Sequence, residues 1–213
     1  MKRVLAGFSL AVVMMLPACV PAMAQDSGPQ LTLTTANGQT TFRIGERIPL
    51  ELVFTGPSNG RYQVEMGSEE RRPGFTFEDV KVSPEGGWAD PLKIYIESLM
   101  GYGGDYLSSD VRLSAKPEVI PMDLNEWVRF DEPGRYQVVV TTRRVADLTA
   151  RRAVMPPQSG LVLTSSPIEI QIVQATAAWQ KAKLAEIESA LAKPVKKNDP
   201  PSPGQQTAMA DLL

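Results

Sequence analysis

The sequence contains no histidine and a single cysteine, Cys19. Histidine is the commonest general base near neutral pH and the commonest side-chain ligand of transition metals, so its absence excludes histidine-dependent hydrolase triads. A single cysteine forms no disulfide within the chain, and the fold must therefore be stabilised by packing alone. We expect a protein that is not an enzyme and that holds neither a metal nor another cofactor.

A basic excess is also absent. The chain has 22 lysines and arginines against 24 aspartates and glutamates. Proteins that bind nucleic acid neutralise phosphates with clustered basic residues, so nucleic acid is not an expected partner. The arginine pairs are interpreted as solvated, because isolated pairs on an acidic protein contribute little. These pairs are Arg71-Arg72, Arg143-Arg144 and Arg151-Arg152.

The N-terminus carries an apolar run from Val4 to Leu16, preceded by two basic residues. The run is shorter than the roughly 20 residues that a transmembrane helix needs, and its layout is typical of a secretory signal. The small-residue pattern Ala22-Met23-Ala24 predicts cleavage before Gln25. We therefore expect residues 1–24 to be a signal peptide, the mature chain to have no transmembrane segment, and the protein to be secreted or periplasmic.

A lipid anchor is the alternative to this soluble exported form. Leu16-Pro17-Ala18-Cys19 resembles a bacterial lipobox, in which the cysteine becomes lipidated and tethers the protein to a membrane face. Pro17 departs from the small residue that is usual at that position. Lipidation at Cys19 therefore ranks second, and it would place the protein at the cell envelope.

Residues 25–174 have the pattern of an all-β domain. Ile168, Ile170 and Ile172 alternate with polar residues, which is the period of strands that bury one face. Similar rows lie at 48–54 and 136–140, and about eight strands are expected in all. Turn signals rich in glycine and proline separate them, and no helical pattern precedes Ala175. The predicted fold is an immunoglobulin-like antiparallel β-sandwich.

Tyr136 is the most specific local signal. It follows Asp131-Glu132-Pro133-Gly134-Arg135 and begins an apolar strand. In immunoglobulin-like sandwiches a tyrosine at such a position donates a hydrogen bond back to the preceding corner. We interpret Tyr136 as this structural corner; an ordinary hairpin with a half-buried tyrosine is the alternative.

The last part of the chain changes character. Residues 175–193 are rich in alanine, leucine, lysine and glutamate and contain no glycine or proline, which predicts an amphipathic helix. Leu184, Ile187 and Leu191 share one face and are predicted to meet a partner, whereas Trp179 lies on another face, toward the sandwich. A helix projecting into solvent is the alternative. Residues 194–213 are predicted to be a disordered, proline-rich tail.

A resemblance rests on the segment Asp123–Tyr136, together with Phe42–Glu46, Asp90-Pro91-Leu92 and Trp179-Gln180. These stretches resemble a recurring pattern in uncharacterised exported proteins of acidobacterial type. In longer relatives of that family a similar sandwich precedes helical HEAT-like repeats. The resemblance implies no activity and no site residues, and this chain stops where the repeats would begin.

Three aromatic residues form the candidate ligand site. Trp88 follows two glycines, and Tyr102 and Tyr106 lie in the glycine-rich stretch 101–106. Aromatic rings in such loops stack on sugars or contact peptides. The predicted function is a non-catalytic interaction module that binds a protein or peptide, and the alternative is a carbohydrate-binding accessory domain. A carboxylate-based hydrolase ranks last, because no spacing singles out an acidic pair.

Overall fold

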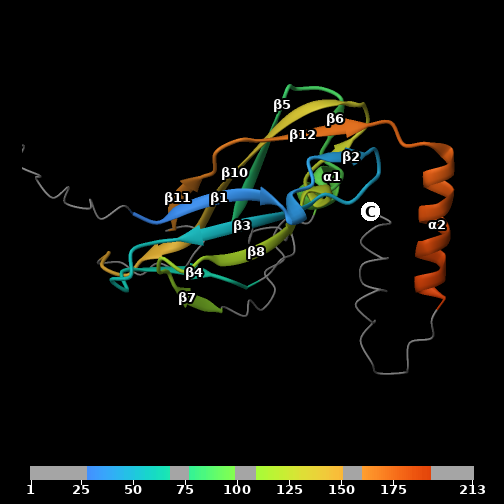
Figure 1. Ribbon diagram of the computed structural model, residues 1–213. Coiled ribbons are helices and arrows are strands. Elements are labelled where there is room, and N and C mark those ends of the chain that lie inside the picture. The colour runs from blue at the N-terminus through green and yellow to red at the C-terminus, as the bar shows by residue number, and fades with distance from the viewer. Residues whose placement is uncertain (1–27, 68–76, 99–108, 151–159, 193–213) are drawn as a thin grey trace, which may run out of the picture.

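In the computed structural model the described residues are 28–67, 77–98, 109–150 and 160–192 (Figure 1). They form mainly β-strands in separate sheets, followed by one C-terminal helix. The prediction of an all-β fold with a helix at its end is confirmed, while the immunoglobulin-like connectivity stays a prediction. The predicted signal peptide, 1–24, and the predicted tail, 194–213, lie outside the described residues.

The strands form three sheets. The smallest pairs β6 (Trp88–Ala89) with β9 (Arg129–Phe130), and a three-stranded antiparallel sheet has the order β1-β3-β8. Its strands are β1 (Gln30–Thr35), β3 (Pro49–Thr55) and β8 (Glu118–Asp123). The largest sheet consists of β2 (Thr41–Arg43), β12 (Ile168–Val173), β10 (Gly134–Asp147), β4 (Tyr62–Glu65), β7 (Asp110–Arg112), β5 (Glu78–Ser83) and β11 (Leu161–Thr164).

The core lies between the two larger sheets and follows the alternation seen in the sequence. On β3 the side chains of Leu50, Leu52 and Phe54 are buried, and their neighbours along the strand are partly exposed. Ile170 and Ile172 on β12 are buried in the same apolar cluster. Period-two alternation thus places one face of each sheet in a shared core, as in packed β-sheets generally.

Three details of the fold differ from the sequence-based expectation. Twelve strands are present among the described residues rather than about eight, because several are only two to four residues long. The short helix α1 (Lys93–Ser98) precedes residue 175. Strand β2 runs parallel to β12, whereas all other strand pairs of the described part are antiparallel. Short strands and a single helical turn produce too few periods to be recognised in a sequence.

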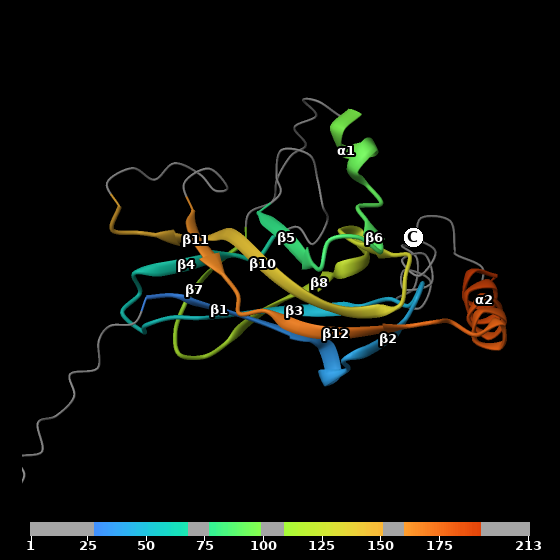
Figure 2. The ribbon, with the colours of Figure 1, turned by 90° about the horizontal axis from the view of Figure 1, so that it is seen from above.

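Strand β10 is the central strand of the large sheet (Figure 2). One of its edges pairs first with β12 and then with β11, and the other edge pairs first with β5 and then with β4. Between β12 and β11 the ladder is continued by Ser165. Its N–H donates to the carbonyl of Val140, and its hydroxyl accepts from the Val140 N–H at 3.1 Å. β10 therefore organises most of the sheet.

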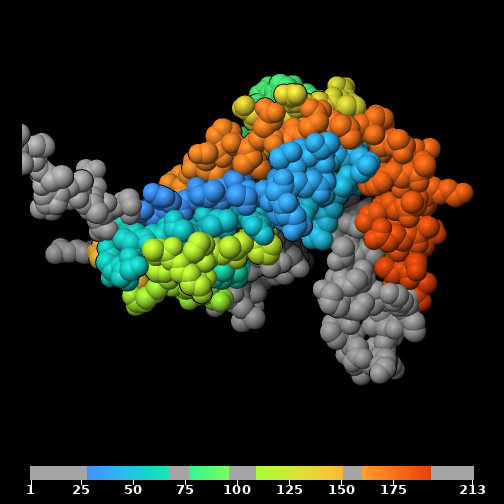
Figure 3. Space-filling model, in the orientation of Figure 1, coloured from blue at the N-terminus to red at the C-terminus, as the bar shows by residue number. Residues whose placement is uncertain are grey.

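Helix α2 (Ala177–Leu191) follows β12 directly and lies at one end of the molecule (Figure 3). Thr176 caps it, because its hydroxyl accepts the N–H of Trp179 at 3.2 Å. The guanidinium of Arg43, on the neighbouring β2, lies 5.5 Å from the Trp179 ring centroid. This contact joins the first turn of the helix to the sheet. No helix in the described part of the chain is long and apolar enough to cross a membrane.

Candidate functional site: the Arg144 cluster

A β-bulge interrupts β10 at Arg143-Arg144. Thr142 pairs with Leu163 and Val145 pairs with Leu161, so three steps on β10 face two steps on β11. The extra residue shifts the alternation, and the consecutive side chains of Arg144 and Val145 are both buried. The interpretation of Arg143-Arg144 as a solvated pair is therefore wrong for Arg144, while Arg143 is exposed.

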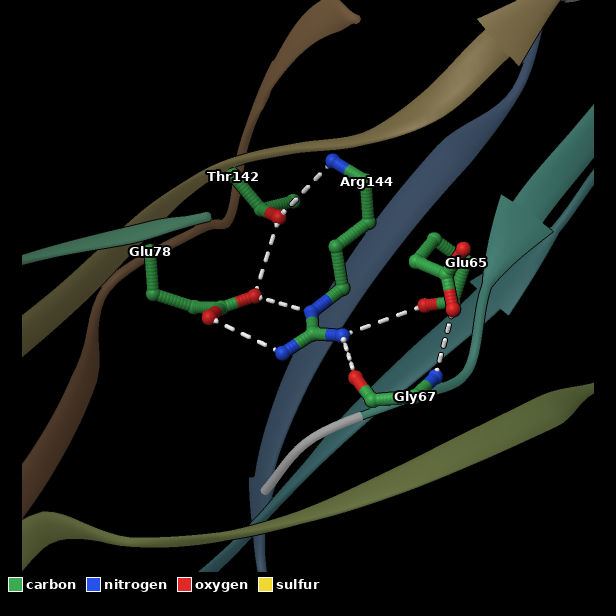
Figure 4. A network of polar contacts seen from close by, with 5 residues as sticks. All are labelled: Glu65, Gly67, Glu78, Thr142 and Arg144. Carbon is green, nitrogen blue, oxygen red and sulfur yellow. Dashed lines mark hydrogen bonds and ion pairs between the residues drawn. The ribbon is translucent and has the colours of Figure 1, made fainter. Parts of the chain in front are cut away.

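Arg144 forms the centre of a buried polar cluster, which we call the Arg144 cluster and which consists of Glu65, Gly67, Glu78, Thr142 and Arg144 (Figure 4). Its Nε and Nη2 donate to the two carboxylate oxygens of Glu78, the latter at 3.2 Å. Its Nη1 donates to the main-chain carbonyls of Glu65, at 3.1 Å, and Gly67, at 2.8 Å. The side chains of Arg144 and Glu78 are only 4% and 8% exposed.

The other members of the cluster complete its hydrogen bonding. The carboxylate of Glu65 accepts the main-chain N–H groups of Gly67, at 2.7 Å, and Ser109, at 3.0 Å. The hydroxyl of Thr142 donates to Glu78 at 3.1 Å and accepts the N–H of Arg144 at 3.3 Å. Buried charges are tolerated only with such partners, and here both carboxylates and the guanidinium have them.

The cluster holds distant parts of the chain at one place. Gly67 and Ser109 are hydrogen-bonded to it, and Phe77 lies beneath the guanidinium at 4.6 Å from the ring centroid. On the other side of β10, the main chain of Gly160 lies so close to the carbonyl of Arg143 that a Cβ at Gly160 would overlap it. Gly67, Phe77, Ser109 and Gly160 come from four separate stretches of sequence, and the cluster and the bulge bring all four to the second half of β10.

The contacts of the Arg144 cluster suit it to hold chain segments in position. Its charges are paired with one another and with main-chain groups, and its one hydroxyl beside a carboxylate, that of Thr142 beside Glu78, is fully buried. Among residues 28–67, 77–98, 109–150 and 160–192, no group of three histidine, cysteine, aspartate or glutamate side chains is arranged to hold a metal ion. The arrangement can orient chain segments, because multidentate arginine contacts are geometrically specific.

The predicted aromatic site is only partly described. Tyr102 and Tyr106 lie outside the described residues. The ring of Trp88 is partly buried against the core, and its indole N–H donates to the carbonyl of Pro84 at 3.1 Å. Trp88 is also paired with Phe130 between β6 and β9. The polar atom of Trp88 is therefore engaged within the chain.

Tyr136 makes the hydrogen bond expected of a corner tyrosine. Its hydroxyl donates to the carbonyl of Glu132 at 3.0 Å, four residues earlier, and lies 3.4 Å from the carbonyl of Gly87. The ring packs on Phe130, with 4.7 Å between centroids. Burial of the hydroxyl, and then the nearby charges of Glu132 and Asp131, raise the pKa of Tyr136 above its ordinary value. The hydroxyl is therefore a neutral donor.

The predicted partner-facing side of the helix is divided. Leu184 and Leu191 are 51% and 39% exposed, but Ile187 is only 6% exposed. Ile187 is therefore buried within this chain and is not available to a partner, which corrects the prediction for that residue. The helix also begins at Ala177 and ends at Leu191, inside the predicted range of 175–193.

A small surface pocket of about 120 Å³ lies at the ends of β3 and β8. Arg47 lines it and forms a bidentate ion pair with Asp123, with Nε–Oδ1 at 2.7 Å and Nη2–Oδ2 at 2.6 Å. Glu51 and Glu126 also line it. The volume corresponds to a few water molecules and is well below that of ordinary small-molecule sites.

No protein-family model, no curated protein and no solved structure matches the chain. The resemblance to exported acidobacterial-type proteins stays a prediction.

Proposed function

We propose that the protein is an exported, non-catalytic interaction module that binds a protein or peptide partner. The observation that carries this proposal is the Arg144 cluster, which holds Gly67, Phe77 and Ser109 together. These residues directly adjoin segments 68–76 and 99–108 of the chain. Binding residues are found disproportionately in connecting segments that a rigid scaffold positions.

The energetic character of the cluster supports a positional role. A buried ion pair is weak support for stability, because desolvation of both charges offsets most of their attraction. Fixing the ends of a binding segment lowers the ordering cost of association. We therefore assign the Arg144 cluster the role of positioning the adjoining recognition segments, in preference to the role of stabilising the core.

Polysaccharide is the second candidate ligand. Tyr95 on α1 is 60% exposed and lies just before segment 99–108, which contains Tyr102 and Tyr106. Aromatic rings close together in sequence suit stacking on sugar rings. The engaged indole of Trp88 makes this candidate weaker than the first.

The proposed location, secreted or periplasmic, rests on the N-terminal sequence. A signal peptide over residues 1–24 would release the chain to the periplasm or the medium, and lipidation at Cys19 would instead anchor it to the envelope. Intact-mass analysis of the protein from an exporting host separates the two, because only the second gives a lipid adduct.

The binding function is tested by panning a displayed peptide library against the exported full chain and measuring retention on insoluble polysaccharides. In the test variant a glycine-serine sequence of equal length replaces residues 99–108. The control variant, Val119→Ser, changes an exposed residue of β8. We expect selected peptides to lose at least tenfold in affinity for the test variant only. Retention on polysaccharide without peptide binding would favour the second candidate, and no binding to either would reject the module.

A further inference from the structure

Among the described strands, the three-stranded sheet ends at two edges, β1 and β8. The N–H of Leu124, just after β8, donates to the carbonyl of Ile48, just before β3, at 3.1 Å. Because main-chain groups alternate in direction along a strand, the even-numbered residues of β3 bond to β8 and its odd-numbered residues bond to β1. In the observed register these odd-numbered residues oppose the even-numbered residues of β1. The open edge of β1 is therefore formed by the main-chain groups of Leu31, Leu33 and Thr35.

The edge at β8 is blocked and the edge at β1 is not. By the same alternation, Pro121 has its main-chain groups at the open edge of β8. Proline has no N–H to donate, and proline and charged residues are the usual protection of edge strands against pairing. Strand β5, which also has one open edge in the described part of the chain, carries Asp79 and Lys81. Strand β1 reads Gln-Leu-Thr-Leu-Thr-Thr, so it has neither a proline nor a charge along its length.

The open edge of β1 lies at the surface. Figure 3 shows the atoms of β1, in blue, along the front of the molecule. Strand β11 lies near β1, but its ladder is formed with β10. Within the part of the chain that the structure describes, the N–H groups of Leu31, Leu33 and Thr35 have no hydrogen-bond acceptor. A row of unpaired N–H and carbonyl groups is a template for one more strand.

We propose that this edge pairs with β1 of a second copy, antiparallel, so that the two three-stranded sheets become one continuous sheet. The register that uses every N–H of the edge is centred on Thr32. In this register the N–H of Leu31 donates to the carbonyl of the partner's Leu33, and the N–H of Leu33 donates to the carbonyl of the partner's Leu31. The N–H of Thr35 lies opposite the carbonyl of the partner's Pro29. Twofold symmetry repeats each bond, so every donor of the edge is satisfied in both copies.

A second copy suits this edge because β1 is complementary to itself. In the proposed register Thr32 faces its own counterpart across the axis, and Gln30 lies opposite the partner's Thr34. Leu31 and Leu33, which are 9% and 4% exposed, lie opposite each other on the core side of the sheet. All of these pairs are uncharged, whereas like charges at opposite positions would destabilise the pairing. An unrelated peptide would have to match this pattern, and the second copy matches it by symmetry.

The pairing requires no rearrangement of either copy. It uses the side of β1 that faces away from β3, so the hydrogen bonds between β1 and β3 are kept. One strand pair buries less surface than a standard protein–protein interface of about 1,600 Å². The dimer should therefore exchange reversibly with the monomer and become populated as the concentration rises.

Two charge variants of the exported full chain test the register, with sedimentation velocity at increasing concentration as the measurement. Both carry Thr34→Lys, which lies opposite Glu51 within each copy and is therefore a shared change. One adds Gln30→Lys, and the other adds Gln30→Glu. Because residue 30 lies opposite residue 34 of the partner, the first variant has like charges across the pairing and the second has opposite charges. We expect the like-charged variant to dimerise at least tenfold more weakly than the oppositely charged one.

Cysteine trapping tests the same axis and compares the two edges of the sheet. With Cys19 changed to serine, Thr32→Cys places one thiol at the proposed axis, where opposite Cα atoms would be about 4.5 Å apart and within disulfide range. Val119→Cys is the matched control, because Val119 is also exposed and lies in the same cross-strand row on β8. After mild oxidation, we expect Thr32→Cys to give disulfide-linked dimers at least ten times as efficiently as Val119→Cys.

Thr35→Pro removes one N–H of the edge that β3 does not use, at a φ of −84° that is close to the range of proline. It should weaken dimerisation and leave urea unfolding of the monomer unchanged. A parent chain that stays monomeric at all concentrations, or equal dimerisation of the two charge variants, would overturn the proposal. Peptides that bind the parent as a monomer and fail to bind Thr35→Pro would also overturn it, because the edge would then accept a foreign strand in place of a second copy.

Discussion

The two ends of strand β10 are equally buried and chemically opposite. Tyr136, near its beginning, and Arg144, near its end, are both 4% exposed. Tyr136 packs in a regular ladder and donates one neutral hydrogen bond to a preceding turn. Arg144 lies at a bulge and joins a carboxylate and two carbonyls. Two equally buried side chains should therefore differ in their effect on stability when they are removed. Removal of the Arg144 guanidinium leaves the Glu78 carboxylate buried without its cation, whereas removal of the Tyr136 hydroxyl leaves no charge without a partner.

The largest effect is expected from Arg144→Met. The substitution leaves Glu78 buried without its cation, and the free energy of unfolding should fall by about 3–5 kcal/mol. Arg143→Met is the matched control, because the side chain of Arg143 is exposed. It should change the free energy of unfolding by less than about 0.5 kcal/mol. Urea unfolding followed by circular dichroism measures both. Similar losses for the two variants would contradict the assignment of charge burial to Arg144.

A double variant sharpens this result. Glu78→Leu combined with Arg144→Met removes both charges, so neither remains buried without a partner. We expect the double variant to be more stable than Arg144→Met alone, because apolar replacement of a buried ion pair is often neutral. Losses that simply add in the urea series would show that the two side chains do not act as a pair.

The opposite end of β10 is tested through Gly87. A Cβ at this position would lie 2.5 Å from the Tyr136 hydroxyl, and the backbone has φ of 71°. Gly87→Ala should therefore destabilise the protein by about 1–3 kcal/mol. Gly86 also has positive φ, 94°, but its Cβ would meet nothing within 4 Å. The excess loss of Gly87→Ala over Gly86→Ala in thermal unfolding measures crowding at the corner, and no excess would contradict it.

Removal of the corner hydrogen bond alone should have a smaller effect. Tyr136→Phe keeps the ring contact with Phe130 and deletes the donor to Glu132. The expected loss is about 1 kcal/mol, typical of a neutral hydrogen bond. Urea unfolding compares it with Arg144→Met. If the two losses were equal, the contrast between a neutral and a charged buried group would not hold.

The sequence pattern shows which side chains of β10 face the core as far as Arg144 and fails at Val145. The alternation of Tyr136, Val138 and Val140 correctly predicts which side faces the core. Continued by two steps, it also passes through Thr142 and Arg144, so the inward position of Arg144 had a signal that its charge obscured. The burial of Val145 had none, because a bulge depends on how neighbouring strands pair and not on the local pattern.

The helix illustrates a second limit. Its apolar residues identify a helix correctly, but they do not say how it is rotated about its axis. Arg43, more than a hundred residues earlier in the chain, lies over Trp179, while Leu184 remains exposed. The burial of Glu65 was likewise not predictable from its own segment, because its carboxylate accepts hydrogen bonds from the main-chain N–H groups of Gly67 and Ser109. Long-range contacts decide such orientations, and periodicity within one segment does not record them.

The smallest effect is expected at Asp147, the last residue of β10, where the charged contact lies at the surface. Arg61 donates to its carboxylate, with Nη2–Oδ2 at 2.6 Å, and the Thr149 hydroxyl donates at 2.7 Å. These hydrogen bonds, that of Arg61 first, hold the pKa of Asp147 well below its usual value of 3.8. Because the pKa is lowered in the folded state, the stabilisation is complete above the unfolded-state pKa and is lost as pH falls below about 4 toward the folded-state pKa.

Asp147→Asn should therefore reduce stability modestly at pH 7, and the difference from the parent should shrink as the pH is lowered below 4. Urea unfolding at several pH values measures this trend. In an Arg61→Gln background the same substitution should have less effect, because its main hydrogen-bond donor is gone. If the stability difference between Asp147→Asn and the parent stayed constant with pH, Asp147 would stabilise the fold through packing or neutral hydrogen bonds and not through its charge. The surface pair would then no longer serve as the exposed counterpart of the buried Arg144–Glu78 pair.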